Sequence, residues 1–138
     1  WVTSRVVARA ERTLDVGADR VFETGQRLPE RVDAAFETVG EATWQHSIRS
    51  LRPGGVLVVS GATSGFAATT ELNRVYFLQL RILGSTMGTR AELERLVAFL
   101  DRTGVRPVVD SVRPLSEARD AFAAMETGDV FGKLVLRP

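Results

Sequence analysis

A nearly uninterrupted apolar run, Val56-Leu57-Val58-Val59, constrains the fold of this chain more than any other feature of its sequence. A strand buried on both faces needs such a run, whereas a strand with one face in water alternates apolar and polar residues. The run follows Arg52-Pro53-Gly54-Gly55 and precedes Gly61-Ala62-Thr63-Ser64-Gly65, a loop of small residues. We therefore expect the central strand of a parallel sheet, with the small-residue loop at its carboxyl end.

Segments typical of strands and helices alternate along most of the chain. The expected strands are residues 1–3, 20–23, 32–39, 56–60 and 81–86. The expected helices are residues 7–16, the turns that contain Trp44, Ile48 and Leu51, residues 71–80 and residues 91–103. In the third helix the apolar spacing predicts that Leu72, Val75, Tyr76 and Leu80 face inward. Strand–helix units with short loops predict an α/β fold with a doubly wound parallel sheet and right-handed crossovers.

The last part of the chain has a different pattern. Residues 108–112, the helix 116–127 and residues 133–136 alternate more strongly between apolar and polar, as expected of strands from a different sheet. We therefore expect two parts, residues 1–106 and residues 107–138.

Composition excludes several classes of protein. The chain has 138 residues, 44% of them apolar and 25% charged, as in a globular domain. A balance of 18 basic against 17 acidic residues argues against nucleic acid as a partner. There is no cysteine, and the single histidine, His46, which we expect to face outward, cannot by itself form a zinc site. Without a signal peptide or an apolar run long enough for a membrane, we expect a cytoplasmic protein with no membrane partner.

Four motifs in a fixed order indicate a family. They are Leu51-Arg52-Pro53-Gly54-Gly55, GATSG at 61–65, QLRILGSTMGT at 79–89 and Phe131-Gly132-Lys133. With these motifs the chain resembles the C-terminal part of medium-chain dehydrogenase/reductases, closest to the zinc-binding alcohol dehydrogenase and quinone oxidoreductase-like branch. The resemblance covers essentially all 138 residues.

The resemblance implies a partial Rossmann domain. Such proteins begin with a GroES-like catalytic domain and continue with a Rossmann domain that binds NAD(P). This sequence has no counterpart of the catalytic domain, of its zinc ligands, or of the first Rossmann strand with its glycine-rich turn. We therefore expect further sequence upstream. We expect no metal site in this segment and name no catalytic residue. Residues 107–138 would pack on the absent catalytic domain.

The missing strand has a physical consequence. In the strand order 3-2-1-4-5-6 the first strand lies at the centre of the sheet. If residues 1–5 hold strand 2 and residues 32–39 hold strand 4, a gap with two unpaired strand edges separates them. We do not expect a stable isolated domain unless these strands close up or another chain supplies the strand.

The end of the first strand predicts the cofactor preference. Thr3-Ser4-Arg5 stands where an acidic residue would accept the ribose 2′-hydroxyl of NAD. Hydroxyls and a guanidinium suit a 2′-phosphate instead. The resemblance therefore implies that Ser4, Arg5 and Arg9 hold the phosphate of NADP, with NAD as the other possibility. The alternative is an ordinary solvated basic helix start.

Other candidate cofactor-binding residues follow the later strands. The resemblance places Val39, Gly40, Gly61, Ala62, Thr63, Ser85, Thr86 and Met87 against the nicotinamide half of the cofactor. Relatives also often carry a basic residue at the position of Lys133, facing the cofactor phosphates. The alternatives are a tight turn, a helix-entry glycine, a turn closed by serine or threonine side chains, and a solvated lysine.

These observations predict the cofactor-domain part of an NAD(P)-dependent oxidoreductase. The parent enzyme would transfer hydride to or from a small alcohol, carbonyl or quinone-like substrate, and this segment alone would be inactive. A methyltransferase-like domain and a non-enzymatic dimerising remnant remain as alternatives. We also expect a homodimer through the strand Arg81–Thr86, at the sheet edge, and expect proline at Leu83 to remove one of its edge donors.

Overall fold

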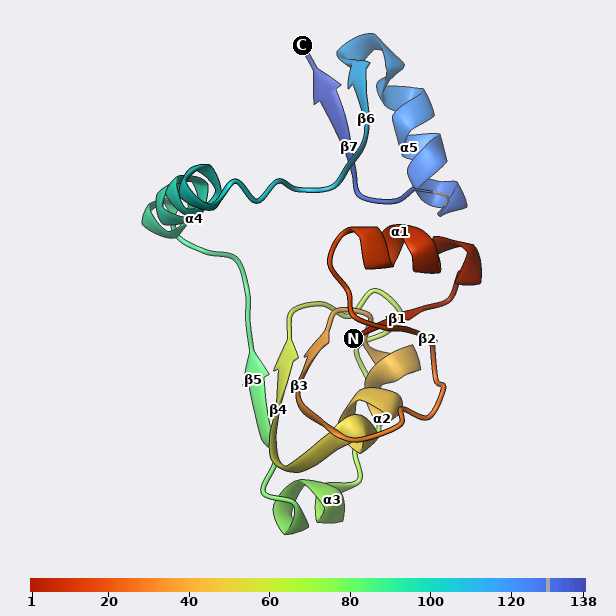
Figure 1. The fold of residues 1–138 in the computed structure, drawn as a ribbon, viewed down its shortest axis with the longest axis vertical. Helices are drawn as coiled ribbons and strands as arrows, with labels where there is room; N and C mark the ends of the chain where they lie inside the picture. The colour runs from red at the N-terminus through yellow and green to blue at the C-terminus, as the bar shows by residue number, and fades with distance from the viewer. Residues whose placement is uncertain (129) are drawn as a thin grey trace. The chain divides into compact units, whose positions relative to one another are not determined.

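The computed structural model describes residues 1–128 and 130–138, which form two compact units, Trp1–Met87 and Gly88–Pro138 (Figure 1). The first unit contains the strands β1 (Val2–Ser4), β2 (Val21–Glu23), β3 (Val32–Glu37), β4 (Leu51–Val59) and β5 (Arg81–Gly84). Its helices are the 3₁₀ turn η1 (Val7–Arg9), α1 (Ala10–Asp15), α2 (Glu41–Ser50) and α3 (Leu72–Phe77). The predicted alternation of strands and helices is confirmed.

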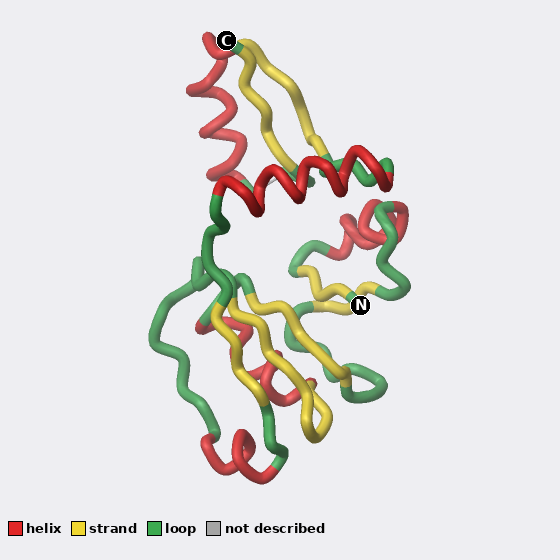
Figure 2. The backbone as a smooth tube through the Cα atoms, turned by 90° about the vertical axis from the view of Figure 1, so that its left-hand side faces the viewer, coloured by secondary structure: helices red, strands yellow, loops and turns green. Residues whose placement is uncertain are grey.

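Strands β3, β4 and β5 of the first unit form one parallel sheet in the order β3-β4-β5 (Figures 1 and 2). Strand β4 begins at Leu51, directly after α2, and pairs there with Val32. The register then shifts between Val32 and Ala34, because Pro53-Gly54-Gly55 adds residues to β4 before Val56 pairs with Ala34. The central strand of the structure is therefore longer than the apolar run that predicted it.

The core of the first unit lies where α2 and α3 pack against β3 and β4. Its fully or nearly fully buried side chains are Ile48, Leu51, Leu57 and Leu80. Leu57 is fully buried, whereas its neighbours Val56 and Val58 are only half-buried. The predicted central position of this strand is confirmed, and within this unit the face that carries Leu57 is more deeply buried than the face that carries Val56 and Val58.

Helix α3 also departs from the sequence expectation. It ends at Phe77, and Gln79 adopts a positive φ of 51°, so the helix does not continue to Leu80. Leu72 and Tyr76 are 72% and 63% exposed, so the prediction that they face inward is wrong, whereas Val75 and Leu80 do contact the core. A helix of six residues presents only one narrow stripe to the sheet, and the flanking apolar side chains stay outside it.

The predicted gap in the sheet is confirmed. Strands β1 and β2 form a separate parallel pair, and within residues 1–128 and 130–138 β1 pairs only with β2 and β3 only with β4. The carbonyl of Ser4 accepts from Thr24 N–H, so the intervening Thr3 directs its backbone groups to the free edge of β1. In the same way, Glu37 O accepts from Ser60 N–H, which directs the backbone of Phe36 away from β4.

A groove of about 930 Å³ separates the two free edges. Its lining includes Trp1, Val2 and Thr3, every residue of β3, and His46 on α2. His46 was expected to face outward; it is half-buried here, and its Nε2 lies 2.8 Å from the carbonyl oxygen of Gln26. The strands on either side of the gap do not close up.

The second unit is a parallel strand pair with a crossover helix, lying side by side in Figures 1 and 2. Its elements are α4 (Arg90–Thr103), β6 (Val109–Pro114), the 3₁₀ turn η2 (Leu115–Glu117), α5 (Ala118–Thr127) and β7 (Lys133–Arg137). Helix α4 begins at a capping box, in which Thr89 and Glu92 bond each other's backbone N–H, and ends at the left-handed Gly104. The prediction of a separate sheet for the last strands is confirmed.

In the part of the chain that the structure describes, no helix has the length and apolar character needed to span a membrane.

Candidate functional site

The carboxyl ends of β3, β4 and β5 lie side by side, because the three strands are parallel and in register. Glu37 pairs with Val59, and Val59 pairs with Gly84, so the segment that follows each strand leaves the sheet at the same edge. This edge carries the turn 38–40, the loop 61–65 and the segment 85–87. The predicted site residues brought to this edge are Val39, Gly40, Gly61, Ala62, Thr63, Ser85, Thr86 and Met87.

The turn 38–40 and the loop 61–65 are in close backbone contact. A Cβ on Gly40 would lie 2.6 Å from Gly65 O and 2.8 Å from the Cα of Ala62. A Cβ on Gly61 would lie 2.6 Å from Thr38 O. Gly40 also has a φ of 95°, which residues other than glycine rarely adopt. Two glycines are thus required by the packing of the turn on the loop.

Hydrogen bonds from Ser64 join the loop to the turn and to helix α2. The Ser64 N–H and hydroxyl both donate to Val39 O, at 2.8 and 2.7 Å. The same hydroxyl accepts from Ala42 N–H at 3.0 Å, and Gly65 O accepts from Glu41 N–H at 3.3 Å. The loop therefore caps the N-terminus of α2, and these N–H groups are not available to a phosphate.

Glu37 occupies the centre of this edge, at the end of β3. Its side chain is only 2% exposed. Oε1 accepts from Val39 N–H at 2.8 Å, Gly40 N–H at 3.0 Å and the Thr43 hydroxyl at 2.8 Å. Oε2 accepts from the Ser47 hydroxyl at 2.5 Å. A buried carboxylate is tolerated here because every one of these bonds stabilises its charged form.

The same contacts set the pKa of Glu37. Burial by itself raises the pKa of this carboxyl. The hydrogen bonds from Ser47, Gly40, Val39 and Thr43 lower it and together outweigh burial, so the pKa lies below its ordinary value. Glu37 is therefore ionised at neutral pH and acts as an acceptor.

The segment after β5 is the open side of the edge. Ser85 N–H donates to Val59 O at 2.8 Å, which continues the pairing of β5 with β4 by one residue beyond Gly84. Ser85, Thr86 and Met87 are exposed, Met87 to 92%. Their hydroxyls and the thioether are thus accessible at the same edge as the loop 61–65.

The candidate residues at the end of β1 and just after it lie elsewhere in the first unit. Thr3 lines the groove between the free edges together with Val39. The Ser4 hydroxyl closes a local turn through Val6, with Oγ 3.2 Å from Val6 N and 3.1 Å from Val6 O. Arg5 is exposed, and Arg9 is the N-cap residue of α1. The structure brings only Thr3 of this group to the groove.

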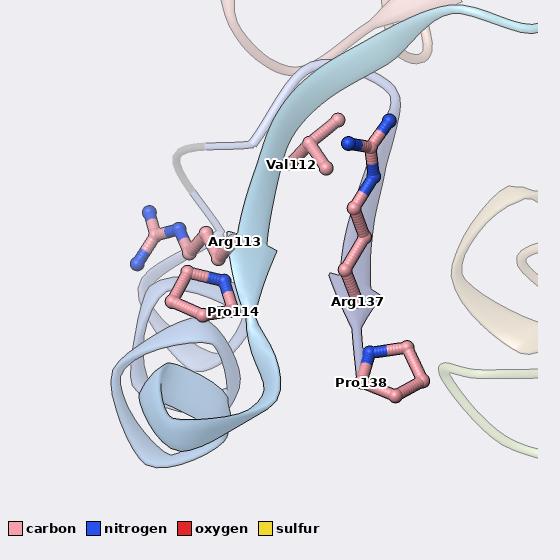
Figure 3. Close-up of a pocket in the computed structure, with 5 residues that line it drawn as sticks. All are labelled: Val112, Arg113, Pro114, Arg137 and Pro138. Carbon is pink, nitrogen blue, oxygen red and sulfur yellow. The ribbon is translucent and has the colours of Figure 1, made fainter.

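Lys133 belongs to the second unit, where it begins β7. Its side chain is exposed and its N–H donates to Val108 O at 2.9 Å. A shallow pocket of about 370 Å³ lies at the far end of the same strand pair, lined by Val112, Arg113, Pro114, Arg137 and Pro138 (Figure 3). The guanidinium groups of its two arginines point in different directions and do not converge on one anion (Figure 3).

The residues at this edge suit part of a nicotinamide cofactor and do not suit a metal. Among residues 1–128 and 130–138 there is no group of three or more His, Cys, Asp or Glu side chains that could hold an ion, so zinc does not fit here. Exposed hydroxyls and a low loop of small residues suit the flat, polar nicotinamide half. The capped N-terminus of α2 does not suit the phosphates.

Sequence reasoning missed two residues of this edge, Glu37 and Ser64. The sequence signal for Glu37 is an acid near the end of an expected strand, followed by Gly40, Thr43 and Ser47. The last two are four residues apart and therefore lie on one helix face. Ser64 was within the small-residue loop but had no predicted role. Nothing in the sequence signals that it caps a helix that begins 23 residues earlier.

A parallel sheet with helices between its strands, and glycine-lined loops at the carboxyl edge, is the architecture of Rossmann-type dinucleotide-binding domains. The zinc-binding dehydrogenase family matches residues 9–136, and the chain belongs to this family.

Relatives and solved structures agree with this assignment. The chain is 29% identical to an alcohol dehydrogenase of Geobacillus stearothermophilus, over 94% of this chain and 40% of that protein. It is 29% identical to a 2-methylene-furan-3-one reductase of Solanum lycopersicum, over 90% of this chain and 29% of that protein. The crystal structure of an NAD-dependent alcohol dehydrogenase superposes on 99% of this chain with a TM-score of 0.85 and 27% identity, and the chain covers 43% of it. The chain thus spans less than half the length of these proteins.

Proposed function

We propose that this chain forms part of the cofactor-binding domain of an NAD(P)-dependent oxidoreductase acting on a small alcohol, carbonyl or quinone-like substrate. The observation that carries the proposal is the carboxyl edge of β3, β4 and β5, where the turn 38–40, the loop 61–65 and the segment 85–87 lie next to one another. Ligands of open α/β sheets bind at this edge. Membership of the dehydrogenase family supports a nicotinamide as the ligand.

The residues of this edge contact the nicotinamide half of the cofactor. Thr63, Ser85 and Thr86 offer exposed hydroxyls for the carboxamide and ribose of the nicotinamide half. The glycines let the loop 61–65 pack closely on the turn 38–40. A bound nicotinamide supplies the hydride chemistry, and these residues orient the ring.

We propose NADP in preference to NAD. Ser4 ends β1, Arg5 follows it, no acidic residue stands among residues 3–6, and Arg9 ends the turn η1. A guanidinium binds phosphate oxygens through charge-assisted hydrogen bonds. A role for Lys133 in holding the phosphates, and packing of residues 107–138 on a separate catalytic domain, belong to the same proposal.

Calorimetric titration of the chain with NADPH and NADH tests this function. We expect tighter binding of NADPH. Arg5→Ala should weaken NADPH binding by roughly tenfold to a hundredfold, since a hydrogen bond to a charged group contributes about 1.5–3 kcal/mol, and should leave NADH binding unchanged. Arg27→Ala removes an exposed arginine of the same unit and is the control.

Equal affinities for the two cofactors in the wild type would contradict the preference for NADP. Binding of S-adenosylmethionine without binding of either nicotinamide would favour a methyltransferase-like domain instead.

We also propose a homodimer through the free edge of β5. This strand pairs only with β4 in the described part of the first unit, and Ile82 and Leu83 are 40% and 50% exposed on it. An apolar edge strand without proline is a template for pairing with a second copy. A two-fold axis would join the two sheets into one.

A further inference from the structure

Glu37 is a buried acid whose charge serves no reaction step in the proposed function. We propose that Glu37 is a positioning residue of the cofactor edge, which holds the turn 38–40 in the one conformation on which the loop 61–65 can close. The proposal rests on the proposed function in one respect, because it assigns cofactor binding to this edge.

Glu37 contacts the turn 38–40 directly. The N–H groups of Val39 and Gly40 are successive in the chain, and both donate to Oε1 of Glu37, at 2.8 and 3.0 Å. Two successive N–H groups can point at one oxygen only if the peptide planes between them keep a fixed orientation. Gly40 keeps its φ of 95° in this arrangement. The carboxylate thus fixes the backbone at the point where the chain leaves β3.

Glu37 also bonds the helix α2, which follows the turn. Thr43 and Ser47 lie four residues apart on one face of α2, and their hydroxyls donate to the two oxygens of Glu37, at 2.8 and 2.5 Å. The first two turns of α2 are therefore attached to the same carboxylate as the turn before it. The direction of the helix and the shape of the turn are set together.

The loop after β4 bonds both the turn and the start of this helix. Ser64 donates twice to Val39 O, and Gly65 O accepts from Glu41 N–H. These partners belong to the turn and to the first residue of the helix, which Glu37 holds from the other side. The loop packs so closely on the turn that a Cβ on Gly40 would lie 2.8 Å from the Cα of Ala62, so a turn that moved toward the loop would displace it. A change at Glu37 is therefore transmitted to both segments of the candidate site.

A carboxylate meets these requirements better than its closest substitutes. Glutamine keeps an oxygen that accepts from Val39 and Gly40, and the Ser47 hydroxyl can rotate to accept from its amide, but the charge is lost. Leucine keeps much of the side-chain volume and leaves the two N–H groups without their acceptor. We therefore expect the turn and the loop to be held most firmly in the wild type, less firmly in Glu37→Gln and least firmly in Glu37→Leu.

The test uses the whole chain and two independent measurements. Hydrogen exchange by NMR reports the amides of Val39, Gly40 and Ser64 without cofactor, and calorimetry reports the dissociation constant of NADPH. For Glu37→Leu we expect exchange of these amides to be roughly tenfold faster or more, as for the loss of one to two hydrogen bonds, and NADPH affinity to fall by a similar factor. Glu37→Gln should fall between this variant and the wild type.

A matched pair of variants on α2 keeps the test valid if Glu37→Leu fails to fold. Ser47→Ala removes a hydroxyl that bonds Glu37. Ser50→Ala removes a hydroxyl of the same helix that bonds His46 O at 2.8 Å instead. We expect faster exchange at Val39 and Gly40 in the first variant and unchanged exchange in the second.

The two measurements separate the possible failures. Unchanged amide exchange in Glu37→Gln, Glu37→Leu and Ser47→Ala would overturn the positioning role, whatever the cofactor does. Faster exchange together with an unchanged NADPH dissociation constant would overturn it as well and leave Glu37 a purely structural residue. Failure of the wild type to bind either nicotinamide would refute the proposed function, while the amide exchange would still report whether Glu37 holds the two segments.

Discussion

The hydroxyl of Ser64 donates to the carbonyl oxygen of Val39 at 2.7 Å and accepts from the N–H of Ala42 at 3.0 Å. One side chain from the loop after β4 therefore bonds both the turn after β3 and the start of helix α2. Gly40, the N-cap residue of that helix, has no side chain with which to cap it. The loop supplies the cap, and the turn, the loop and the helix depend on one another as a result.

Gly40→Ala should destabilise the first unit by more than its backbone strain alone. A residue with a side chain at a φ of 95° costs about 1–3 kcal/mol, and the new Cβ would also lie within 2.8 Å of two backbone atoms of the loop. Gly54→Ala is the matched control, because Gly54 has a φ of 76° with nothing within 4 Å of its missing Cβ. Urea unfolding of both variants measures the difference, and equal losses would contradict close packing of the loop on the turn.

Acid should destabilise the first unit partly through Glu37. Because the folded-state pKa of Glu37 lies below its ordinary value of 4.5, the ionised carboxylate stabilises the fold above that value, and this contribution is lost as the pH falls through the folded-state pKa. Melting temperatures of wild type and Glu37→Gln should therefore converge as the pH falls from 7 into that range.

Glu71→Gln is the control for this experiment. The pKa of Glu71 is also lowered, chiefly by its hydrogen bond with Arg49, but the pair is exposed. Exposed ion pairs contribute little to stability. A pH profile that Glu71→Gln alters more than Glu37→Gln would show that the buried carboxylate is not the main acid-sensitive group.

Amide exchange along β3 should alternate. Glu37 directs its backbone to β4, as its carbonyl bond with Ser60 N–H shows, so the amides of Ala35 and Glu37 should be protected. The amides of Ala34 and Phe36 face the groove and should exchange much faster. Equal protection at all four residues would mean that a strand covers the free edge of β3 in solution.

Ile82→Pro should dissociate the proposed dimer into monomers. Ser85 N–H donates to β4, so Leu83, two residues earlier, also directs its N–H there, and only Ile82 and Gly84 point theirs to the free edge. The expectation that proline at Leu83 removes an edge donor is therefore wrong, since it would break the pairing of β5 with β4 instead. Sedimentation should show monomers for Ile82→Pro and dimers for Ile82→Thr, which keeps the N–H. A monomeric wild type would rule the dimer out.

Much of the fold could be predicted because it depends on neighbours in the sequence. The spacing of Trp44 and Ile48, the glycines that end helices, and the run Val56–Val59 are local patterns, and the corresponding elements are present. Leu51 was expected in the same helix as Trp44 and Ile48, but α2 ends at Ser50 and Leu51 begins β4. The gap beside β3 also followed, because the strand that fills this position in the family's strand order has no counterpart in this sequence. Burial was less predictable, because whether Leu72 or Tyr76 is covered depends on what packs over a short helix.

The sequence by itself determined the strand–helix alternation, the parallel sheet and the edge at which the candidate site lies. Only the tertiary structure decided that Glu37 is buried among four donors and that Ser64 caps α2. The physical reason is that strands and helices space their apolar side chains at periods of 2 and 3.6 residues. These spacings relate residues that are near one another in the chain, so they are visible in the sequence. The bond from Ser64 to Val39 joins residues 25 positions apart, and it exists only because two parallel strands place their carboxyl ends side by side.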